Sequence, residues 1–485
     1  MNSVSHQFEA ALGIVERLRA AGYEAYFAGG CVRDLLLGRE PSDYDVATSA
    51  TPDVVLEMFP RTFAVGAHFG VVLIATGGAA DAAGGAETKP DYVLTEVATF
   101  RSDGAYSDGR HPDAVRYTLS AEEDVKRRDF TINGLLIDPL RGTGLQEAGH
   151  SAPLRFAQDD SAIKEEVRAA VIDFVGGVRD LEAGVARAIG RAEERFEEDH
   201  LRMLRAVRFA ARFEFELEAG TKAAVRWLAS RISAVSRERV RDELTKMLTE
   251  GHARRAFELL DETGLLPEVL PEIARMKGVE QPAQYHPEGD VWVHTLGLLG
   301  QLQAGCSATL AWGALLHDVG KPATFRRAPD RIRFDGHVEV GMAVGAEILR
   351  RFRFSNEETR QVLALVENHM RFADAERMKA STLKRFFRLP AFEEHLALHR
   401  MDCIAGSGNL EHWELVRERW QTMPEEAVRP KPLITGRELI AAGYTPGAGF
   451  KEMLRAVEDA QLEGTIATED EALGLVRERF PLNGN

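Results

Sequence analysis

The chain changes its secondary-structure pattern near Arg195, and this change constrains the fold more than any other feature. Before that point, short apolar and β-branched runs such as 25–28 and 71–74 alternate with segments of helical spacing. After it, the pattern is almost wholly helical. Because 485 residues exceed what one hydrophobic core covers, we expect three or four domains. The predicted fold class is a mixed α/β head followed by a long α-helical body.

The composition bears on location and partners. The cysteines Cys31, Cys306 and Cys403 are scattered without a C-x-x-C pair, which favours a reducing cytoplasm over a disulfide framework or a thiolate zinc site. No signal peptide is visible, and no stretch is long and apolar enough to span a bilayer. The net charge of −16 argues against a general nucleic-acid binder, although residues 201–255 carry 13 Lys+Arg against 7 Asp+Glu. We therefore expect a cytoplasmic protein without a membrane partner, which can still hold a specific RNA.

The first motif that bears chemistry joins a Gly-Gly turn to two closely spaced aspartates. Gly29 and Gly30 follow the predicted strand 25–28, and Asp43 and Asp45 follow with one residue between them. A D-x-D on a strand puts both carboxylates on one face, where they repel unless a cation lies between them. The Gly-Gly turn allows backbone N–H groups to approach an anion. These residues predict a site for a nucleoside triphosphate and Mg²⁺, with a surface turn carrying solvated acids as the alternative.

The second motif, residues 126–135, gathers basic residues, a carboxylate and an amide within a short segment. Arg128 offers a guanidinium fork for phosphate oxygens. Asp129 and Asn133 offer groups that bind sugar hydroxyls. This composition suits a triphosphate with its ribose. A helix N-terminus with surface charges is the alternative, and it is less favoured beside a D-x-D.

The third motif, residues 198–209, has helical spacing. On a helix, Asp199, Arg202 and Arg205 fall on one face, and apolar residues such as Leu204 occupy much of the opposite arc. We therefore expect a helix that buries one side and presents a row of Asp and Arg on the other. An exposed i,i+3 salt bridge, which is common and weak, is the plain alternative.

In this order, these segments resemble the class II tRNA nucleotidyltransferases, a family that includes CCA-adding enzymes and bacterial poly(A) polymerases. The matching patterns are G-G-x-V-R-D, D-x-D, R-R-D-F-T-I-N and E-D-x-x-R-x-x-R-x-x-R-F, and residues 236–244 resemble the family's neck-helix motif. The resemblance covers roughly residues 25–248. It implies a nucleotidyltransferase palm with a mixed sheet as the head, over 1–197, with insertions near 77–90 and 141–165. An all-α neck over 198–275 would bind the base and the RNA.

The resemblance also implies residue roles. Asp43 and Asp45 would be catalytic and bind Mg²⁺, and Asp199 with Arg202 would read the incoming base. A carboxylate that accepts from an exocyclic amine, beside a guanidinium that donates to a ring nitrogen, suits cytosine and adenine and rejects uracil and guanine. Arg205 and Arg208 would hold phosphate or support the helix. The implied nucleotide-binding residues are Gly29, Gly30, Arg33, Arg128, Asp129, Asn133, Asp199, Arg202, Arg205 and Arg208.

The implied reaction is in-line attack of a tRNA 3′-hydroxyl on the α-phosphate of CTP or ATP, with release of pyrophosphate. Motif spacing does not separate CCA addition from CC-only, A-only or poly(A) addition. The polar segment 100–112 is a candidate for the switch from C to A addition, through Arg101 and Arg110. A hairpin loop with solvated ends is an equally good interpretation of that segment.

A second set of candidate metal ligands lies far downstream, with His294 first, the adjacent His317 and Asp318 next, and Asp402 last. The order of the whole set, H…HD…H…H…D, resembles the pattern of the HD phosphohydrolase domain. Imidazole and carboxylate ligands suit Ni²⁺, Mn²⁺, Fe or Mg²⁺. The resemblance implies an HD domain over 276–410, a helical tail over 411–485, and a phosphohydrolase activity in RNA end repair. One alternative is a protein that is chiefly an HD hydrolase and whose head only binds nucleotide. Another is a non-catalytic RNA-binding protein. The sequence leaves the oligomeric state open. The expected ligands are His294, His317, Asp318, His337, His369 and Asp402.

Overall fold

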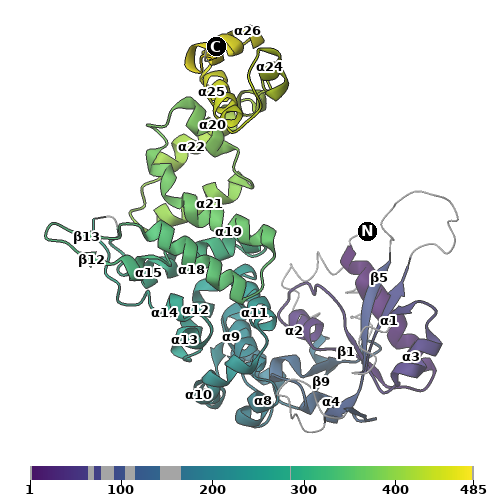
Figure 1. Cartoon of the computed structure of the whole chain (residues 1–485). Coiled ribbons are helices and arrows are strands. Elements are labelled where there is room, and N and C mark those ends of the chain that lie inside the picture. Colours follow the sequence, from purple (N-terminus) through teal and green to yellow (C-terminus); the bar gives the residue numbers. More distant parts are fainter. Residues whose placement is uncertain are drawn as a thin grey trace. The chain divides into compact units, whose positions relative to one another are not determined.

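The structure is a computed structural model that describes residues 3–63, 70–77, 92–103, 115–141, 165, 167–284 and 286–482 (Figure 1). It divides into two compact units, Met1–Met247 with Arg255–Val269 and Leu248–Arg254 with Leu270–Asn485. The first unit carries the main sheet and the second is mostly helical, so the predicted change of pattern along the chain is confirmed. The expected insertions near 77–90 and 141–165, and Arg110, lie almost wholly outside the described residues and stay predictions.

The first unit is built on a seven-stranded mixed sheet with the order β3-β4-β5-β2-β1-β8-β9. Strands β2 and β5 are parallel, and the other neighbouring pairs of this sheet are antiparallel. A separate hairpin pairs β6 (Arg101–Asp103) with β7 (Val115–Tyr117). The strands of the sheet are β1 (Ala25–Ala28), β2 (Val46–Thr48), β3 (Thr62–Phe63), β4 (Val71–Thr76), β5 (Val93–Thr99), β8 (Leu135–Ile137) and β9 (Val171–Asp173).

Both faces of this sheet are covered by helices. Phe27 of β1 packs against Phe8 of α1 (Ser3–Ala20), whereas its neighbour Ala28 joins a second cluster with Val125 of α4 (Ala121–Lys126). Successive residues of a strand point to opposite faces, which explains why the apolar runs of these strands are nearly continuous. The first cluster also includes residues of α2 (Gly30–Leu36) and α3 (Pro52–Met58).

Helices complete the first unit after the sheet. Helix α9 is amphipathic, with Leu204 and Val207 fully buried and a row of arginines along another face. The expected neck is not purely helical, because β11 (Glu216–Leu217) pairs with β10 (Val185–Ala186). The helical elements are η2 (Thr131–Asn133), α7 (Gly177–Glu182), α8 (Ala192–Glu198), α9 (Leu201–Phe213), α10 (Ala219–Leu228), η3 (Ala229–Ala234), α11 (Arg237–Thr249), α12 (Ala253–Glu262) and α13 (Leu266–Val269).

The second unit is a helical body in which α16 packs against α15, α19 and α21, and α18 packs against α19. It also holds one short hairpin, β12 (Arg326–Arg327) with β13 (Ile332–Arg333). No helix of the described part of the chain is long and apolar enough to cross a membrane. Its helical elements are α14 (Pro271–Ala274), α15 (Val291–Leu299), α16 (Ala308–Leu316), α17 (Lys321–Thr324), α18 (His337–Arg351), α19 (Asn356–Asn368), η4 (His369–Asp374), α20 (Ala380–Phe387), α21 (Phe392–Ala405), α22 (Glu411–Thr422), α23 (Glu425–Val428), α24 (Gly436–Ala441), α25 (Gly449–Glu463) and α26 (Glu469–Arg479).

Two smaller cores follow along this body. One joins residues of η4, α20, α21 and α22, and the other joins α24, α25 and α26. These cores are compatible with an HD domain followed by a tail, but α22, which begins the predicted tail 411–485, shares its core with α21. The predicted domain boundaries therefore stay predictions.

Candidate functional site

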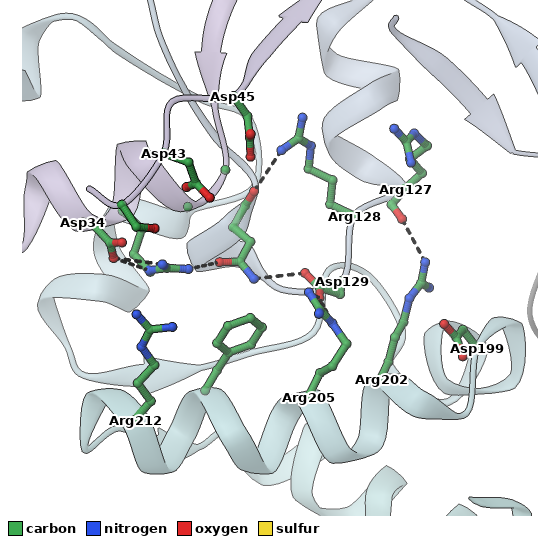
Figure 2. A pocket seen from close by; sticks show the side chains of 16 residues that line it. Asp34, Asp43, Asp45, Arg127, Arg128, Asp129, Asp199, Arg202, Arg205 and Arg212 are labelled. Carbon is green, nitrogen blue, oxygen red and sulfur yellow. Dashed lines mark hydrogen bonds and ion pairs between the residues drawn. The ribbon is translucent and has the colours of Figure 1, made fainter. Parts of the chain in front are cut away.

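A pocket of about 510 Å³ in the first unit brings the head motifs together (Figure 2). Both predicted catalytic aspartates line it, as do all the predicted nucleotide-binding residues except Arg208. The sequence analysis missed five further lining residues, Asp34, Ser42, Arg127, Phe209 and Arg212. Arg212 lies seven residues after Arg205, two turns along the same helix face, so the helical period was the signal that could have found it.

The two aspartates lie just before a strand and not on it, because β2 begins at Val46. The expectation that both aspartates of the D-x-D lie on a strand is therefore wrong. The segment still runs beside β1, since the Ala28 N–H donates to the Asp45 carbonyl over 3.0 Å. Tyr44 is buried in the core, 4% exposed, between the two aspartates. The alternation that places both aspartates on one face thus arises from the buried Tyr44 between them, in the segment before the strand.

A third carboxylate faces this pair. Glu96 lies on β5, and the parallel register that pairs Val46 with Val97 places it beside Asp45. Asp45 and Glu96 line a common pocket. Burial, then Glu96 and Asp43, raise the pKa of Asp45 to about 7. A carboxylate inside the apolar run 93–99 was the signal for Glu96, and three clustered acids fit a divalent cation such as Mg²⁺.

A hydrogen-bonded chain of side chains forms the opposite wall (Figure 2). The Arg33 guanidinium, 5% exposed, donates to Asp34 Oδ1 over 2.9 Å and to Asn133 Oδ1 over 2.6 Å. The Asn133 amide donates to Asp129 Oδ1 over 3.1 Å, and Arg205 donates to Asp129 Oδ2 over 2.8 Å. Burial alone would raise the pKa of Asp129, but the Arg205 charge and the hydrogen bonds hold it below its ordinary value. These polar groups are therefore fixed before a ligand arrives.

Two neighbouring arginines share one buried carboxylate. Asp124, 2% exposed, accepts from Arg127 over 2.7 Å and from Arg128 over 3.0 Å. Burial opposes ionisation of Asp124, and the charges of Arg128 and Arg127 outweigh it, so the pKa of Asp124 is lowered. Gly29 has φ 72°, and a Cβ there would lie 3.2 Å from Arg128 Nη1. Glycine thus allows the guanidinium to pass close to the backbone of the turn.

The predicted base-reading pair lies where two helices meet. Asp199 was expected on the helix, but it lies between α8 and α9, with φ −144°. Its Oδ1 accepts from the Leu201 N–H over 3.0 Å, and its Oδ2 accepts from Arg239 over 2.7 Å. Arg202 donates to Glu198 Oε2 over 2.5 Å. A hydrogen bond at the start of α9 and ion pairs thus hold the two residues in the lining of the pocket. Their role in reading the base stays a prediction.

Arg208 is the exception among the predicted residues. It is 5% exposed, does not line the pocket, and donates from Nε to Glu243 Oε2 of α11 over 2.7 Å. Of the two roles expected for it, phosphate binding or support of the helix, its contacts favour support. Figure 2 shows Arg202, Arg205 and Arg212 extending from α9 toward the other lining residues.

The predicted ligands of the helical body also meet, around Asp318. Asp318 follows the end of α16 and is 2% exposed. Its Oδ2 lies 3.1 Å from His317 Nε2 and 3.9 Å from His294 Nε2. Its Oδ1 lies 3.8 Å from His369 Nε2 and 3.9 Å from His337 Nε2. The sixth residue, Asp402 of α21, joins them because its Oδ1 lies 3.0 Å from His294 Nε2. Five helical segments that are distant in sequence thus bring the six residues together.

The imidazoles all present the same nitrogen to the carboxylates. The Nδ1 atoms of His317, His337 and His369 lie 2.7 to 3.0 Å from backbone carbonyl oxygens three residues earlier. Each Nδ1 must carry the proton to donate there, so each Nε2 keeps a lone pair. These Nε2 atoms, and that of His294, are buried without a hydrogen-bond partner in the described part of the chain. Lone pairs that face carboxylate oxygens repel them unless a cation lies between, so the residues fit a divalent metal.

The pKa values support this interpretation. Burial lowers the pKa of His369 to about 4, so its ring stays neutral near pH 7 and can act as a ligand. Burial opposes a positive charge on His294, but the Asp402 and Glu288 carboxylates outweigh it and raise the pKa of His294 to about 9. A ring placed between two carboxylates attracts a cation, which is either a proton or a metal ion.

A pocket of about 430 Å³ opens onto these ligands and contains residues that the sequence analysis missed. Lys321 Nζ lies 2.7 Å from Asp318 Oδ2 and 2.7 Å from Gln281 Oε1. His286 also lines the pocket, and Glu288 contacts both His286 and His294. The run 317–321, H-D-V-G-K, was the signal for Lys321, whereas His286 and Glu288 offered only proximity to His294 in the sequence.

Three family models match parts of the chain. The poly A polymerase head domain matches residues 25–150, the "probable RNA and SrmB-binding site of polymerase A" matches 214–277, and domain 2 of tRNA nucleotidyltransferase matches 338–476. The mixed sheet, the adjacent aspartates and the arginine-lined pocket agree with these matches. Together they define the class of the protein as the nucleotidyltransferases.

Curated relatives and solved structures narrow the class. The chain is 30% identical to the CCA-adding enzyme of Geobacillus stearothermophilus over 469 residues, which covers 96% of this chain and 95% of that enzyme. It is 31% identical to that of Levilactobacillus brevis over 98% of both chains. The match to the Geobacillus thermodenitrificans enzyme is 41% identical over 258 residues, and it spans about half of that enzyme, 54% of its length.

The structural comparison agrees. The Bacillus stearothermophilus CCA-adding enzyme in complex with CTP superposes with a TM-score of 0.69 at 27% identity, over 99% of this chain and 98% of that one. The Thermotoga maritima CCA-adding enzyme complexed with tRNA shares the fold, with a TM-score of 0.56 at 18% identity over 97% of this chain and 95% of that one. This chain belongs to the family of CCA-adding enzymes.

Proposed function

We propose that the protein adds C, C and A to the 3′ end of tRNA, using CTP and ATP and releasing pyrophosphate. The observation that supports this most is the meeting, in one pocket, of the aspartates Asp43 and Asp45 with the pair Asp199 and Arg202. The first pair suits the reacting phosphate, and the second suits a base that offers an amine beside a ring acceptor. We also propose a cytoplasmic location, since the three cysteines are free and scattered.

The chain's own residues account for most of the chemistry. Arg33 and Arg128, both held by buried carboxylates, would bind the triphosphate without reorganising. The polar chain ending in Asp129 would orient the sugar. Mg²⁺ held by Asp43 and Asp45, with Glu96 adjacent, would lower the pKa of the attacking hydroxyl and neutralise the pyrophosphate. The 3′-oxygen would then form the new P–O bond while the bond to pyrophosphate breaks in line with it.

Incorporation of single labelled nucleotides tests this proposal. The full chain is incubated with Mg²⁺, a tRNA that lacks its 3′ CCA, and each NTP singly and in pairs. We expect two C and then one A, followed by a stop. Addition of C only, A only or a long A tract would contradict CCA addition and would identify the partial enzymes or a poly(A) polymerase. No incorporation would indicate that the body site is the working one.

The base-reading role has its own test. Arg202→Gln removes the guanidinium charge and its fork, and we expect the preference for CTP over UTP, as the ratio of kcat/KM values, to fall about 10- to 100-fold. Arg241→Ala on α11, which pairs with the exposed Asp242 and does not line the pocket, is the control and should keep the ratio. An unchanged ratio in Arg202→Gln would contradict base reading by this residue.

We further propose that the cluster around Asp318 holds a divalent metal and hydrolyses phosphate esters of RNA ends. What favours this second function is the set of four buried Nε2 atoms directed at two carboxylates. A bound metal would supply an activated water for attack on phosphorus, and the released alkoxide would take a proton. Ni²⁺, Mn²⁺, Fe and Mg²⁺ are the candidates that the ligand types allow.

Substrates that the nucleotide-addition reaction does not use test the second function. We expect the full chain with Ni²⁺ or Mn²⁺ to hydrolyse nucleoside 2′,3′-cyclic phosphates, Asp318→Ala to lose this activity, and Asp43→Asn with Asp45→Asn to keep it. Hydrolysis that survives Asp318→Ala would contradict the assignment. Loss of hydrolysis in the head variant alone would locate that activity in the first unit.

A further inference from the structure

A loop before α15 carries two residues that neither the predicted ligand set nor the comparisons account for, His286 and Glu288. The loop is firmly anchored. Asp290 begins α15 by accepting from the Val293 N–H over 2.8 Å, and it also accepts from the Gly278 N–H over 2.6 Å. Glu288, two residues earlier, lies on the side of His294 away from the ligand cluster, because it contacts Nδ1 while Asp318 and Asp402 face Nε2.

Glu288 distinguishes one imidazole from the other three. The Nδ1 atoms of His317, His337 and His369 contact neutral backbone carbonyls. The Nδ1 atom of His294 instead lies 2.7 Å from Glu288 Oε1. His294 is fully buried, so this contact is shielded from water and is stronger than the same contact at the surface.

The same carboxylate oxygen also holds His286. His286 Nδ1 lies 2.9 Å from Glu288 Oε1, and the rings of His286 and His294 meet edge to face with centroids 4.7 Å apart. One acceptor oxygen between two Nδ1 atoms sets both rings with Nδ1–H toward Glu288 and Nε2 away from it. The other oxygen, Oε2, is buried and has no hydrogen-bond partner among the residues that the structure describes. The charge of Glu288 is therefore directed at these two rings.

We propose that Glu288 is a positioning residue that fixes the tautomer of His294 and makes its Nε2 a stronger metal ligand than the three imidazoles held by backbone carbonyls. This role rests on the proposed metal centre around Asp318. A carboxylate that accepts from the far nitrogen of an imidazole raises the basicity of the ligating nitrogen, and removing such a partner commonly weakens metal binding 10- to 100-fold. Glu288 thereby makes His294 the strongest imidazole ligand of the site.

Calorimetric titration of the full chain with Ni²⁺ tests the role. Asp318→Ala defines the heat that belongs to the body site, since Ni²⁺ bound elsewhere remains in that variant. Glu288→Gln keeps the shape and an acceptor oxygen but loses the charge, so we expect the Kd of the body site to rise about 10- to 100-fold. Glu280→Gln is the matched control, because Glu280 is exposed and pairs only with the exposed Arg327 in the described structure, and its Kd should not change.

A second variant separates positioning from general damage to the loop. His286→Gln leaves the Glu288 charge to His294 alone, so we expect the Kd to stay within about threefold of the wild type. Equal weakening in His286→Gln and Glu288→Gln would overturn the proposal, as would an unchanged Kd in Glu288→Gln. Glu288→Asp, whose shorter arm cannot hold the 2.7 Å contact, should repeat the weakening if Glu288→Gln fails to fold.

The same titration separates this role from the metal centre itself. If wild type and Asp318→Ala bind Ni²⁺ identically, the metal centre is absent, and the role of Glu288 is overturned with it. If the Asp318-dependent heat is present but Glu288→Gln leaves it unchanged, only the role of Glu288 is overturned. Nucleotide incorporation at the wild-type rate in every variant shows that the first unit is intact.

Discussion

In the head pocket, Asp45 lies beside two other carboxylates, Asp43 and Glu96, whereas in the body Asp318 lies among imidazoles and the ammonium of Lys321. Burial and the neighbouring acids raise the pKa of Asp45 to about 7, while the positive groups around Asp318 outweigh its burial and lower its pKa. The half-buried Asp45 and the buried Asp318 thus have opposite electrostatic surroundings.

This electrostatic difference suits two ways of binding a cation. In the head, Arg128 lowers the pKa of Asp45, but burial and the neighbouring acids outweigh it, and the arginines that line the same pocket suit a triphosphate. We expect it to take Mg²⁺ together with the nucleotide. The body surrounds its carboxylates with imidazole Nε2 atoms, and three of these rings direct their Nδ1 protons at backbone carbonyls, which is the arrangement of a resident metal site. Four changes test this comparison, and they follow in order of decreasing expected effect.

The largest effect should come from the head aspartates. Asp43→Asn with Asp45→Asn removes the charge that would hold Mg²⁺, and we expect nucleotide incorporation to fall by about 10³-fold or more. Ni²⁺ binding by the body, measured by calorimetry, should not change, because the two sites share no residues. Retained incorporation would refute the role of these aspartates, and loss of Ni²⁺ binding would show that the sites are not independent.

The converse change is expected to affect only the body. Asp318→Ala removes the carboxylate that lies within 3.9 Å of four imidazole Nε2 atoms, so we expect Ni²⁺ affinity to fall by more than about 100-fold. The rate of CTP incorporation should stay at the wild-type value. A matching loss of incorporation would contradict the division of labour between the two units.

The third change separates the arginines of α9. Arg208→Gln removes the nearer of two arginine partners of the buried Glu243 and leaves Arg205 Nη1 3.8 Å away, and we expect the unfolding free energy of the first unit to fall by about 3 kcal/mol. Thermal unfolding monitored by circular dichroism measures this loss. Arg202→Gln, which lies at the pocket, should change nucleotide selectivity more than stability. A stable Arg208→Gln with lost nucleotide binding would return Arg208 to the phosphate site.

The smallest effect concerns acid stability of the head. The folded pKa of Asp124 is depressed by Arg128 and Arg127, so its contribution is complete above the unfolded pKa of about 4 and is lost as the pH falls through the folded value. Asp124→Asn should therefore cost about 2 kcal/mol at pH 7 and progressively less below pH 4. Denaturant unfolding at pH 7 and pH 3 measures the difference. An equal cost at both values would contradict the ionic origin of the contribution.

Much of the site was readable from local pattern. Asp43, Asp45, Arg128 and Asp129 are found because each motif is a short segment whose residue types suit phosphate, sugar or metal. Arg208 shows what local pattern leaves open. It continues the arginine row of Arg202 and Arg205, but the twist of α9 carries it to the Glu243 side and away from the pocket. Periodicity finds the row, and only packing shows which members face the ligand.

Residues that act through distant neighbours were not readable. Glu96 joins the aspartates because β5 pairs in parallel with β2, a contact between segments about 50 residues apart. Glu288 and His286 show no motif of their own, and their importance comes from one 2.7 Å contact to His294. The segment boundaries also shifted, since Asp45 precedes β2 and Asp199 precedes α9. Side-chain hydrogen bonds at such ends decide where an element starts.

The sequence by itself determined the order of the motifs, the change from mixed α/β to helical structure, and the residue types that each site needs, because these depend on local spacing and composition. Tertiary structure alone decided which carboxylates became neighbours, which nitrogen of each imidazole was directed at them, and whether an arginine faced solvent or a buried glutamate. Those outcomes depend on strand register, helix packing and burial, and they set the charge and tautomer of each group through contacts between residues far apart in the chain.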